Sequence, residues 1–272
     1  MRYGIIAGNG RFPVLALETA RKQGDEVVVF AIREEASPEV ESLASKCYWI
    51  SLGELGKLID GCKNEAISKI MMAGQVRHAK IFSNIRPDWR LAKVLLTLAT
   101  KNTDSLIGGV QQVLLNEGIE LVDSTLLLKP LLATAGAMTR RKPDSDERRD
   151  IDYGRRIANA LSALDLGQSV AIADRACVAL EAMEGTDAML RRAATLVENK
   201  RLTLVKASSR RRHLLFDVPV IGPATIETMI ATGTTVVAVD AGRTLLLDRD
   251  ELLSKANAAG IAVFGMEPEE SN

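Results

Sequence analysis

Residues 3–8 read Tyr-Gly-Ile-Ile-Ala-Gly, a short apolar run that ends in glycine and predicts a buried strand. A helix is predicted next, from Pro13 to Gln23, because its apolar residues have helical spacing and Gly24 ends the pattern. Further strands are predicted at residues 27–32, 47–50 and 67–73. Strands that alternate with helices need crossover connections, and these place parallel strands in a sheet covered on both faces. The first part of the chain is therefore predicted to be an α/β, Rossmann-like domain.

The rhythm changes after residue 130. Two prolines, a glycine and a basic cluster occur in residues 129–147, which is typical of a linker. Beyond it, the predicted strands come in pairs: 169–173 with 177–183, and 235–239 with 244–247 across a hairpin-type turn. The sequence thus predicts a Rossmann-like parallel-sheet domain, residues 1–130, then a linker, 131–143, then an α+β domain with antiparallel pairs, 144–272.

Composition excludes several classes of protein. The 272 residues carry 35 basic and 35 acidic side chains, so no overall field favours binding to nucleic acid. The chain opens directly on a predicted strand, without a secretion signal, and has no apolar run long enough to span a membrane. We therefore expect a cytoplasmic protein. Three scattered cysteines and two histidines argue against zinc chemistry.

Two loops of the first domain are candidates for substrate binding. Gly8, Asn9 and Gly10 lie between the first strand and the first helix, where backbone N–H groups can meet a phosphate. Pro13 replaces the third glycine of a dinucleotide fingerprint, so a structural turn and an anion site stay equally open, and an NAD site is disfavoured. Gln75 and Arg77 follow another strand at the edge where α/β sheets bind ligands, although an ordinary polar loop explains them too.

Carboxylates gather in the second domain at Glu181-Ala182-Met183-Glu184-Gly185-Thr186-Asp187. Carboxylate oxygens near the start of a helix suit Mg²⁺, while the alternative is a helix cap at Thr186 or Asp187 with two solvated glutamates. A basic tract begins at Lys206 and can either grip a pyrophosphate or form a solvated loop. Asp217 stands alone among apolar neighbours, so it is either buried with partners or part of a site.

Taken together, these segments resemble the LpxI family over nearly the whole chain. The matching stretches are Gly4–Pro13, Ala73–Val76, Asp123–Thr125, Gly167–Val170, Glu181–Ala188 and Phe216–Pro223. The resemblance implies a two-domain enzyme that binds its substrate between the domains. It implies hydrolysis of UDP-2,3-diacylglucosamine to UMP and 2,3-diacylglucosamine 1-phosphate, with Mg²⁺, in the lipid A synthesis of a Gram-negative-type bacterium. It also allows a homodimer and a transient contact with the inner membrane surface for lipid handover.

Hydrolysis of a pyrophosphate with Mg²⁺ leads us to expect roles for the candidates above. We expect Asp217 to be the leading catalytic and metal-binding carboxylate, Glu184 to be a second carboxylate for both roles, and Asp187 to be a further catalytic group. Substrate contacts are expected at Gly8, Asn9, Gly10, Gln75, Arg77, Thr186 and Lys206. Residues 209–215 depart from the family's usual Lys-Pro-x-Gln-Asp-x-Arg. Two alternatives stay open: a nucleotide-sugar-binding protein or dinucleotide-dependent oxidoreductase that uses the first domain, and a non-catalytic regulator of envelope synthesis.

Overall fold

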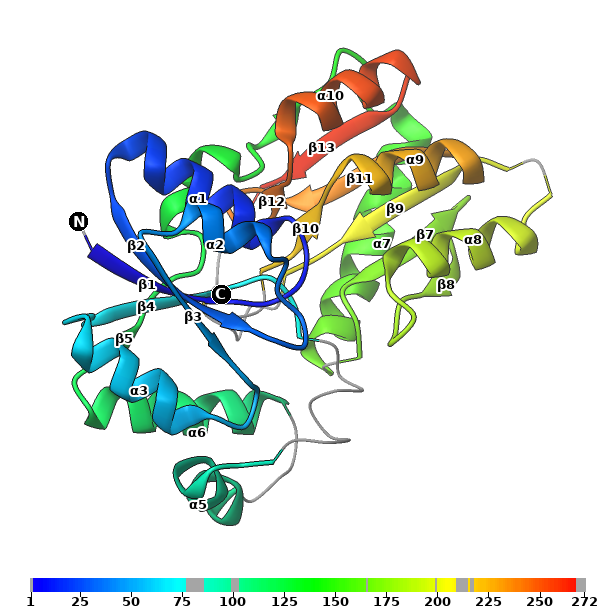
Figure 1. Cartoon of the computed structure of the whole chain (residues 1–272). Helices are drawn as coiled ribbons and strands as arrows, with labels where there is room; N and C mark the ends of the chain where they lie inside the picture. Colours follow the sequence, from blue (N-terminus) through cyan, green and yellow to red (C-terminus); the bar gives the residue numbers. More distant parts are fainter. Residues whose placement is uncertain are drawn as a thin grey trace. The chain divides into compact units, whose positions relative to one another are not determined.

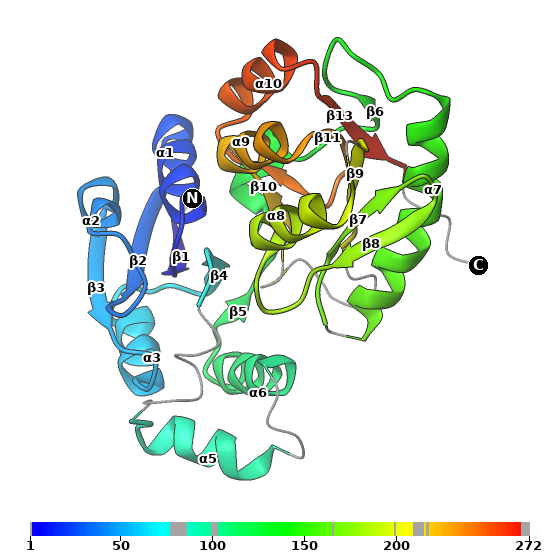
Figure 2. The ribbon, with the colours of Figure 1, turned by 90° about the vertical axis from the view of Figure 1, so that its right-hand side faces the viewer.

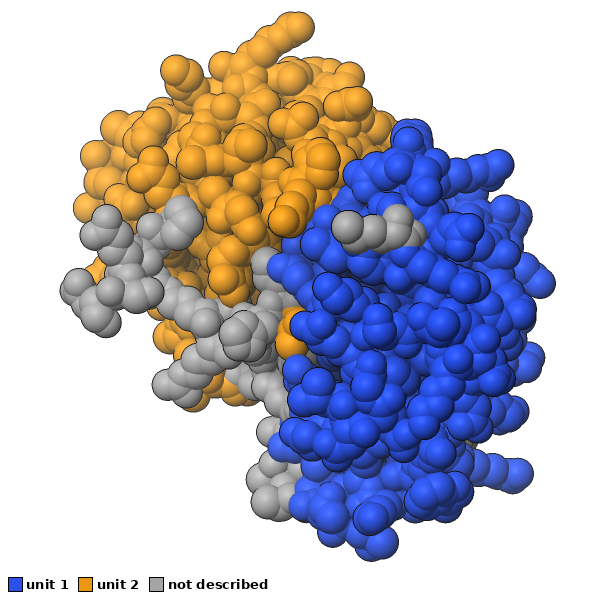
Figure 3. Space-filling view, turned by 90° about the vertical axis from the view of Figure 1, so that its left-hand side faces the viewer, with its two compact units in different colours: residues 1–127 blue, residues 128–272 orange. Residues whose placement is uncertain are grey.

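A computed structural model of the chain describes residues 2–76, 86–98, 103–164, 166–198, 200–208, 215 and 218–267. The chain divides into two compact units, Met1–Leu127 and Leu128–Asn272, which Figure 3 shows in different colours. Each unit has its own sheet and its own covering helices, so each is described by itself below.

Unit 1 contains a five-stranded parallel sheet in the order β3-β2-β1-β4-β5 (Figure 1). Its strands are β1 (Arg2–Ala7), β2 (Glu26–Ile32), β3 (Lys46–Ile50), β4 (Lys69–Ala73) and β5 (Glu120–Leu121). Its helices are α1 (Phe12–Gln23), α2 (Glu39–Leu43), α3 (Leu55–Asn64), α5 (Trp89–Thr97) and α6 (Thr103–Asn116). Since β2 is buried on both faces from Val27 to Ile32, its sequence is apolar throughout and does not alternate. The predicted parallel, Rossmann-like sheet is confirmed.

The strand order of unit 1 reverses between β1 and β4. The chain runs outward from β1 to β3, then crosses back to β4 on the other side of β1. In open α/β sheets, ligands bind at the carboxyl ends of the two strands that flank this reversal. The loops after Ala7 and Ala73 occupy that position.

Unit 2 is built on a mixed six-stranded sheet in the order β6-β13-β11-β9-β7-β8. Its strands are β6 (Gly136–Ala137), β7 (Ser169–Ala173), β8 (Ala176–Leu180), β9 (Leu202–Lys206), β11 (Thr234–Asp240) and β13 (Ala262–Met266). Strands β9, β11 and β13 are parallel, whereas β7 is antiparallel to both β8 and β9. The helices are α7 (Ser145–Ala163), α8 (Thr186–Leu196), α9 (Pro223–Thr232) and α10 (Arg249–Ala258). The predicted pairing of β7 with β8 is confirmed. The predicted fold class is confirmed as well: a Rossmann-like parallel-sheet domain is followed by a second domain of helices around a sheet that contains antiparallel pairs.

The predicted hairpin of residues 235–239 with 244–247 is wrong. Strand β11 pairs in parallel with β9 and β13, while β12 (Leu245–Leu246) pairs in parallel with β10 (Val220–Ile221) in a separate two-stranded sheet. The chain does turn after Asp240, but it continues through β12 into helix α10 and returns as β13. Strand β11 is therefore an interior strand of a parallel region, covered on both faces.

The segment expected to be a linker, residues 131–143, is packed against unit 2. Within it, β6 pairs antiparallel with β13, the Ala133 amide donates to the Thr244 carbonyl (2.8 Å), and the Thr139 hydroxyl accepts from the Val263 amide (2.9 Å). Helix α7 then begins at a complete capping box, in which Asp144 caps the helix and Glu147 bonds back to the Asp144 amide.

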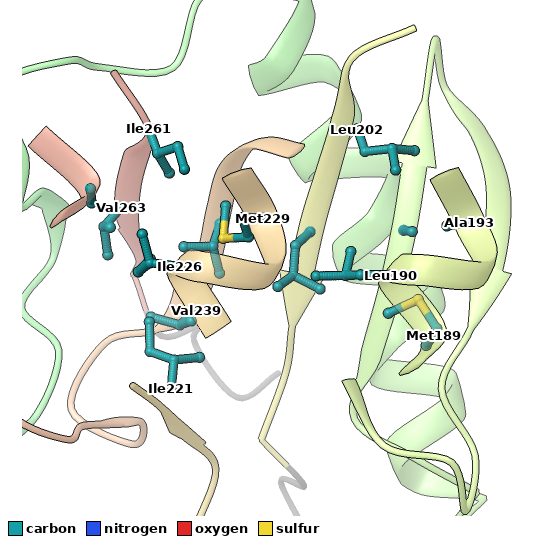
Figure 4. Packing of buried hydrophobic residues seen from close by; sticks show 14 of the residues in the cluster. Met189, Leu190, Ala193, Leu202, Ile221, Ile226, Met229, Val239, Ile261 and Val263 are labelled. Atoms are coloured by element: carbon teal, nitrogen blue, oxygen red, sulfur yellow. The ribbon is translucent and has the colours of Figure 1, made fainter. Parts of the chain in front are cut away.

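Two apolar layers cover the unit 2 sheet. The larger one lies on the side of α8, α9 and α10 and includes Met189, Leu190, Ile226 and Met229, which Figure 4 labels. On the opposite face, helix α7 contributes a second layer, to which Val205 and Ala207 belong. Because Leu202 and Leu204 point into the first layer, Lys206 points to the α8 side of the sheet as well. Of the helices in the described part of the chain, none is long and apolar enough to cross a bilayer.

Candidate functional site

Three polar residues meet at one edge of the unit 2 sheet. Lys206 is the last residue of β9, Ser169 is the first of β7, and Glu181 directly follows β8. The antiparallel course of β7 places Ser169 opposite Lys206, and the Glu181 amide donates to the Ser169 carbonyl (2.9 Å). This edge is the carboxyl end of the parallel strands, where ligand sites of α/β sheets are found.

The Thr186 hydroxyl links these residues to the start of helix α8. It donates to Glu181 Oε1 (2.8 Å), accepts from Lys206 Nζ (3.1 Å) and lies 3.1 Å from Ser169 Oγ. We call Ser169, Glu181, Thr186 and Lys206 the Thr186 cluster. Ser169 is completely buried, and Glu181 and Lys206 are each 8% exposed. Polar groups buried this deeply are held in one arrangement. Each has lost its hydrogen bonds to water, so breaking the hydrogen bond to its partner would leave it unpaired in the interior.

Gly167 makes this arrangement possible. A Cβ atom on residue 167 would lie 2.2 Å from the Glu181 carbonyl oxygen, so only glycine lets the two segments approach. At this approach, the Gln168 amide donates to the second carboxylate oxygen of Glu181 (3.3 Å). The Gly167–Val170 and Glu181–Ala188 stretches, read separately in the sequence, thus belong to one local structure.

The two carboxylates beside Lys206 are shifted in opposite directions. Burial by itself would raise the pKa of Glu181, but the charge of Lys206 and hydrogen bonds from Ser169 and Thr186 outweigh it and lower this pKa. Burial raises the pKa of Asp187, and the charges of Arg191 and Lys206 offset only part of this effect. Two neighbouring acids whose pKa values are shifted apart are typical of catalytic sites. The acid with the lowered pKa stays ionised as a counter-ion, and the acid with the raised pKa can act as a base.

Asp187 lies in the first turn of α8 and is half-buried. Within the ranges that the structure describes, its carboxylate forms no hydrogen bond and no salt bridge; Arg191 and Lys206 act on it only through their charge. A carboxylate with a raised pKa and open hydrogen-bonding capacity can accept a proton from water. The sequence-based expectation for Asp187 remains a prediction, now with this physical support.

Glu184 stands apart from the Thr186 cluster. Its carboxylate is exposed and forms a salt bridge with Arg192 (2.7 Å), and it also accepts from the Ala182 amide (3.1 Å). The hydrogen bond from Arg192 is the main reason that the pKa of Glu184 is lowered. A role of Glu184 in catalysis or metal binding stays a prediction, and it would require the carboxylate to leave Arg192.

A second polar network lies on the α7 side of the same sheet edge. Asp240, the buried last residue of β11, accepts from the Ser208 amide (2.7 Å) and from Arg155 (3.4 Å). The Arg243 guanidinium in turn donates to the Ser208 hydroxyl (2.6 Å). These bonds fix the point at which the chain leaves β9. Sequence reasoning missed Asp240 because residues 240–243 resembled a hairpin turn, and it did not give Glu181 or Ser169 a role.

In unit 1, the loop that follows β1 and the loop that follows β4 are joined by backbone hydrogen bonds at the point where the strand order reverses. The Asn9 amide donates to the Gln75 carbonyl (2.7 Å), the Gln75 amide donates to the Asn9 carbonyl (3.0 Å), and the Gly8 amide donates to the Ala73 carbonyl (2.8 Å). The amides of Gly8 and Asn9 are thus engaged by protein, while Gly10 and the side chains of Asn9 and Gln75 are exposed. The expected substrate contacts here stay predictions. Arg77 and Asp217 lie outside the described residues.

A Mg²⁺ site requires several oxygen ligands that are not already engaged by other groups. Over the described ranges, no three His, Cys, Asp or Glu side chains come together in a metal-binding group. The carboxylates of Glu181, Glu184 and Asp240 are each engaged by cationic side chains or hydrogen-bond donors. These residues by themselves therefore do not fit Mg²⁺.

Comparison with known proteins identifies the family. Residues 2–131 match the LpxI N-terminal domain, and residues 134–264 match the LpxI C-terminal domain. The chain belongs to the LpxI family. A protein of Caulobacter vibrioides named UDP-2,3-diacylglucosamine pyrophosphatase LpxI is 31% identical over 279 aligned positions, which cover 99% of each chain. The resemblance found in the sequence is confirmed over both LpxI domains.

Solved structures resemble the chain only distantly. The precorrin-6A reductase CobK has a TM-score of 0.33 at 12% identity, and the match covers all of this chain and 90% of that one. Phosphoribosylglycinamide synthetase from Anaerococcus prevotii has a TM-score of 0.28 at 11% identity, over 63% of this chain and 31% of the other. Neither likeness bears on the chemistry of this LpxI family member.

Proposed function

We propose that this LpxI family member hydrolyses the pyrophosphate bond of UDP-2,3-diacylglucosamine, releasing UMP and 2,3-diacylglucosamine 1-phosphate in lipid A biosynthesis. The observation that carries the proposal is the full-length match to a relative of that name. The chemistry of the Thr186 cluster supports it, because a buried cation and the start of a helix lie at the ligand-binding edge of the unit 2 sheet.

Lys206 and the first turn of α8 are suited to a diphosphate. The N-terminus of a helix carries partial positive charge and unpaired amides, and an ammonium group is a compact positive charge that binds phosphate well. Thr186 accepts a hydrogen bond from Lys206 and so fixes the position of the ammonium, while the ionised Glu181 compensates its charge. Since phosphoryl transfer is promoted chiefly by positioning and charge stabilisation, a fixed cation of this kind is an appropriate catalytic device.

Asp187 is the proposed general base. The oxygen of a water molecule forms a bond to phosphorus, the bond to the bridging oxygen breaks, and the water proton passes to the Asp187 carboxylate. The raised pKa of Asp187 favours this transfer, since a base works best when its pKa approaches the working pH. The Lys206 ammonium stabilises the negative charge that develops on the diphosphate oxygens as the leaving group departs.

A requirement for Mg²⁺ is proposed separately from this scheme. It rests on the family resemblance and on Asp217, because the described carboxylates do not form a metal-binding group without it. Glu184 is a proposed second ligand on the condition that it gives up Arg192. Excess EDTA should abolish turnover and added Mg²⁺ should restore it, whereas full activity in EDTA would remove the metal from the proposal.

The function is tested by incubating the purified full chain with UDP-2,3-diacylglucosamine and separating the nucleotide products. UMP and the acylated sugar phosphate should appear in equal amounts. Unacylated UDP-glucosamine is the substrate control and should be turned over poorly. A single-turnover experiment with excess protein distinguishes an enzyme from a protein that only binds nucleotide sugars, because only the enzyme releases UMP.

A further inference from the structure

Helix α5 (Trp89–Thr97) of unit 1 has two apolar sides. Leu91 and Val94 are buried, whereas Trp89 is 73% exposed and Leu96 is 87% exposed. Lys93, also exposed, lies between them on the same side of the helix, because residues 89, 93 and 96 follow the i, i+4, i+7 spacing. We call Trp89, Lys93 and Leu96 the outward face of α5.

The inward side of α5 is firmly attached to unit 1. It packs against α3 and α6, and Figures 1 and 2 show α5 on the outer side of both helices. The contact with α6 is so close that a Cβ atom on Gly109 would lie 2.6 Å from a methyl group of Val94. The Asp88 carboxylate caps the helix at the Leu91 amide (2.9 Å) and reaches the Gly56 amide at the start of α3 (2.5 Å). The outward face is therefore held outward by the fold.

This exposure is unusual for the surface of a water-soluble helix. An ordinary surface helix turns polar residues outward and needs only one apolar stripe. Here the packed stripe is already supplied by Leu91 and Val94, so Trp89 and Leu96 are not needed to pack α5 against the described residues of unit 1. Tryptophan, with an apolar ring system and a polar N–H, is enriched where hydrocarbon meets water.

Positive charge near the outward face favours an anionic partner. Residues 86–97 contain three cationic side chains, Arg86, Arg90 and Lys93, and one acidic side chain, Asp88, which is engaged by two backbone amides. The Arg90 guanidinium lies 5.4 Å from the centre of the Trp89 ring and also forms ion pairs with Asp60 (3.7 Å) and Glu117 (4.0 Å). In a chain without net charge, this helix is locally cationic. Exposed aromatic and aliphatic side chains beside cations are typical of helices that lie in the headgroup region of anionic bilayers.

We propose that the outward face of α5 binds the surface of an anionic lipid membrane. Trp89 and Leu96 enter the boundary between headgroups and acyl chains, and Lys93 pairs with lipid phosphates. The assignment of the surface rests on exposure and charge. The choice of a membrane as its partner rests also on the proposed function, because a substrate with two acyl chains resides in a bilayer.

The test measures binding of the full chain to substrate-free vesicles of phosphatidylcholine, with and without phosphatidylglycerol, by flotation. The chain should float with the anionic vesicles, and the variant Trp89→Ala/Leu96→Ser should bind at least about tenfold more weakly because two apolar anchors are lost. Lys93→Glu should weaken binding mainly at low salt. The matched control is Leu196→Ser/Ile230→Ser, which removes apolar side chains that are 61% and 53% exposed in unit 2 and should bind as the unchanged chain does.

Tryptophan fluorescence gives an independent reading of the same surface. Trp49, the second tryptophan, donates to Glu41 and can be removed as Trp49→Phe, which leaves Trp89 as the reporter. Its emission should shift to shorter wavelength with anionic vesicles and stay unchanged with phosphatidylcholine alone.

Three results would overturn the proposal: no binding of the unchanged chain to anionic vesicles, equal binding by the Trp89/Leu96 variant, or loss of self-association by that variant together with no vesicle binding. The last result would assign the face to a second copy of the chain. Release of UMP from substrate in detergent micelles should be unchanged in the variant. This measurement separates failure of the membrane proposal from failure of the proposed function.

Discussion

The Lys206 ammonium donates a hydrogen bond to the Thr186 hydroxyl over 3.1 Å, and this bond joins the end of strand β9 to the first turn of helix α8. The Thr186 hydroxyl in turn donates a hydrogen bond to the carboxylate of Glu181, a buried residue that directly follows strand β8. A cation, a hydroxyl and a carboxylate are thus held in fixed order at the sheet edge.

Thr186→Val keeps the shape of the side chain and removes the hydroxyl on which the cluster converges. Lys206 and Glu181 then each lose a buried partner, so the free energy of unfolding should fall by about 1–3 kcal/mol. Because the ammonium is no longer fixed, kcat/KM should also fall, by roughly 10²-fold. Thr195→Val, which removes an exposed hydroxyl from the same helix, is the matched control and should change neither quantity. Unchanged kcat/KM in Thr186→Val would contradict the positioning role.

Asp187→Asn separates a catalytic from a structural carboxylate. Burial makes the charge of Asp187 unfavourable in the folded state, so its removal should leave stability at neutral pH equal or slightly higher. Turnover should nevertheless fall by about 10² or more, the scale of a lost general base. Melting temperature and kcat are to be measured on one preparation. A variant that is destabilised but fully active would refute the assignment.

Asp187 also predicts the acidic limb of the pH profile. The base must be ionised, and its pKa is raised, so kcat should begin to fall at a higher pH than an ordinary aspartate would give. Asp187→Asn should lack this limb in its residual activity. Glu181 acts in the opposite sense on stability: its pKa is lowered, so its contribution is present above the ordinary glutamate pKa and is lost as the pH falls through the folded-state value. Urea unfolding of Glu181→Gln should therefore show a weaker loss of stability in acid.

The metal prediction compares two carboxylates. Asp217→Asn should raise the half-saturating Mg²⁺ concentration by roughly tenfold or abolish turnover, as expected when a charged oxygen ligand is lost. Glu184→Gln is the companion variant. A similar rise in the half-saturating Mg²⁺ concentration would establish Glu184 as a second ligand. An unchanged value would show that Glu184 does not bind the metal and serves only in its salt bridge with Arg192. The requirement is read from initial rates of UMP release across a Mg²⁺ titration.

Gly8→Ala tests the paired loops of unit 1. The added methyl group would lie 2.6 Å from the Gln75 carbonyl oxygen, so the loops must separate, at a cost of about 1–3 kcal/mol in unfolding free energy. The control is Gly108→Ala in helix α6, where the methyl group meets open space and should be neutral or stabilising. Equal stability of Gly8→Ala and the unchanged chain would show that the loops do not pair as described.

Local pattern was sufficient for much of the fold. The apolar runs at residues 3–8 and 27–32 predicted the parallel sheet correctly, because strands buried on both faces cannot alternate. The turn after Asp240 led to a wrong prediction of a hairpin. A turn sequence indicates that the chain bends, but it does not determine which strand pairs with the strand before the turn. That choice is made by packing, and β11 is placed between β9 and β13 by helices on both of its faces.

The candidate site could be predicted only in part, for a related reason. Thr186, Asp187 and Lys206 were recognised from their residue types and their places at the ends of elements. Glu181 and Ser169 were not assigned, because their importance comes from the antiparallel course of β7, which brings Ser169 opposite Lys206. Contacts between segments far apart in the chain depend on register, and register is set by tertiary packing rather than by local sequence.

The proposed reaction cleaves the pyrophosphate bond of a nucleotide–lipid conjugate. The decisive experiment is a single-turnover reaction of the purified full chain with UDP-2,3-diacylglucosamine, with Asp187→Asn as the matched variant. We expect one equivalent of UMP and one of 2,3-diacylglucosamine 1-phosphate per active protein, and strongly slowed release by the variant. Binding of the substrate without release of UMP would refute the proposed hydrolysis, and equal release by the variant would refute the role of Asp187 as its general base.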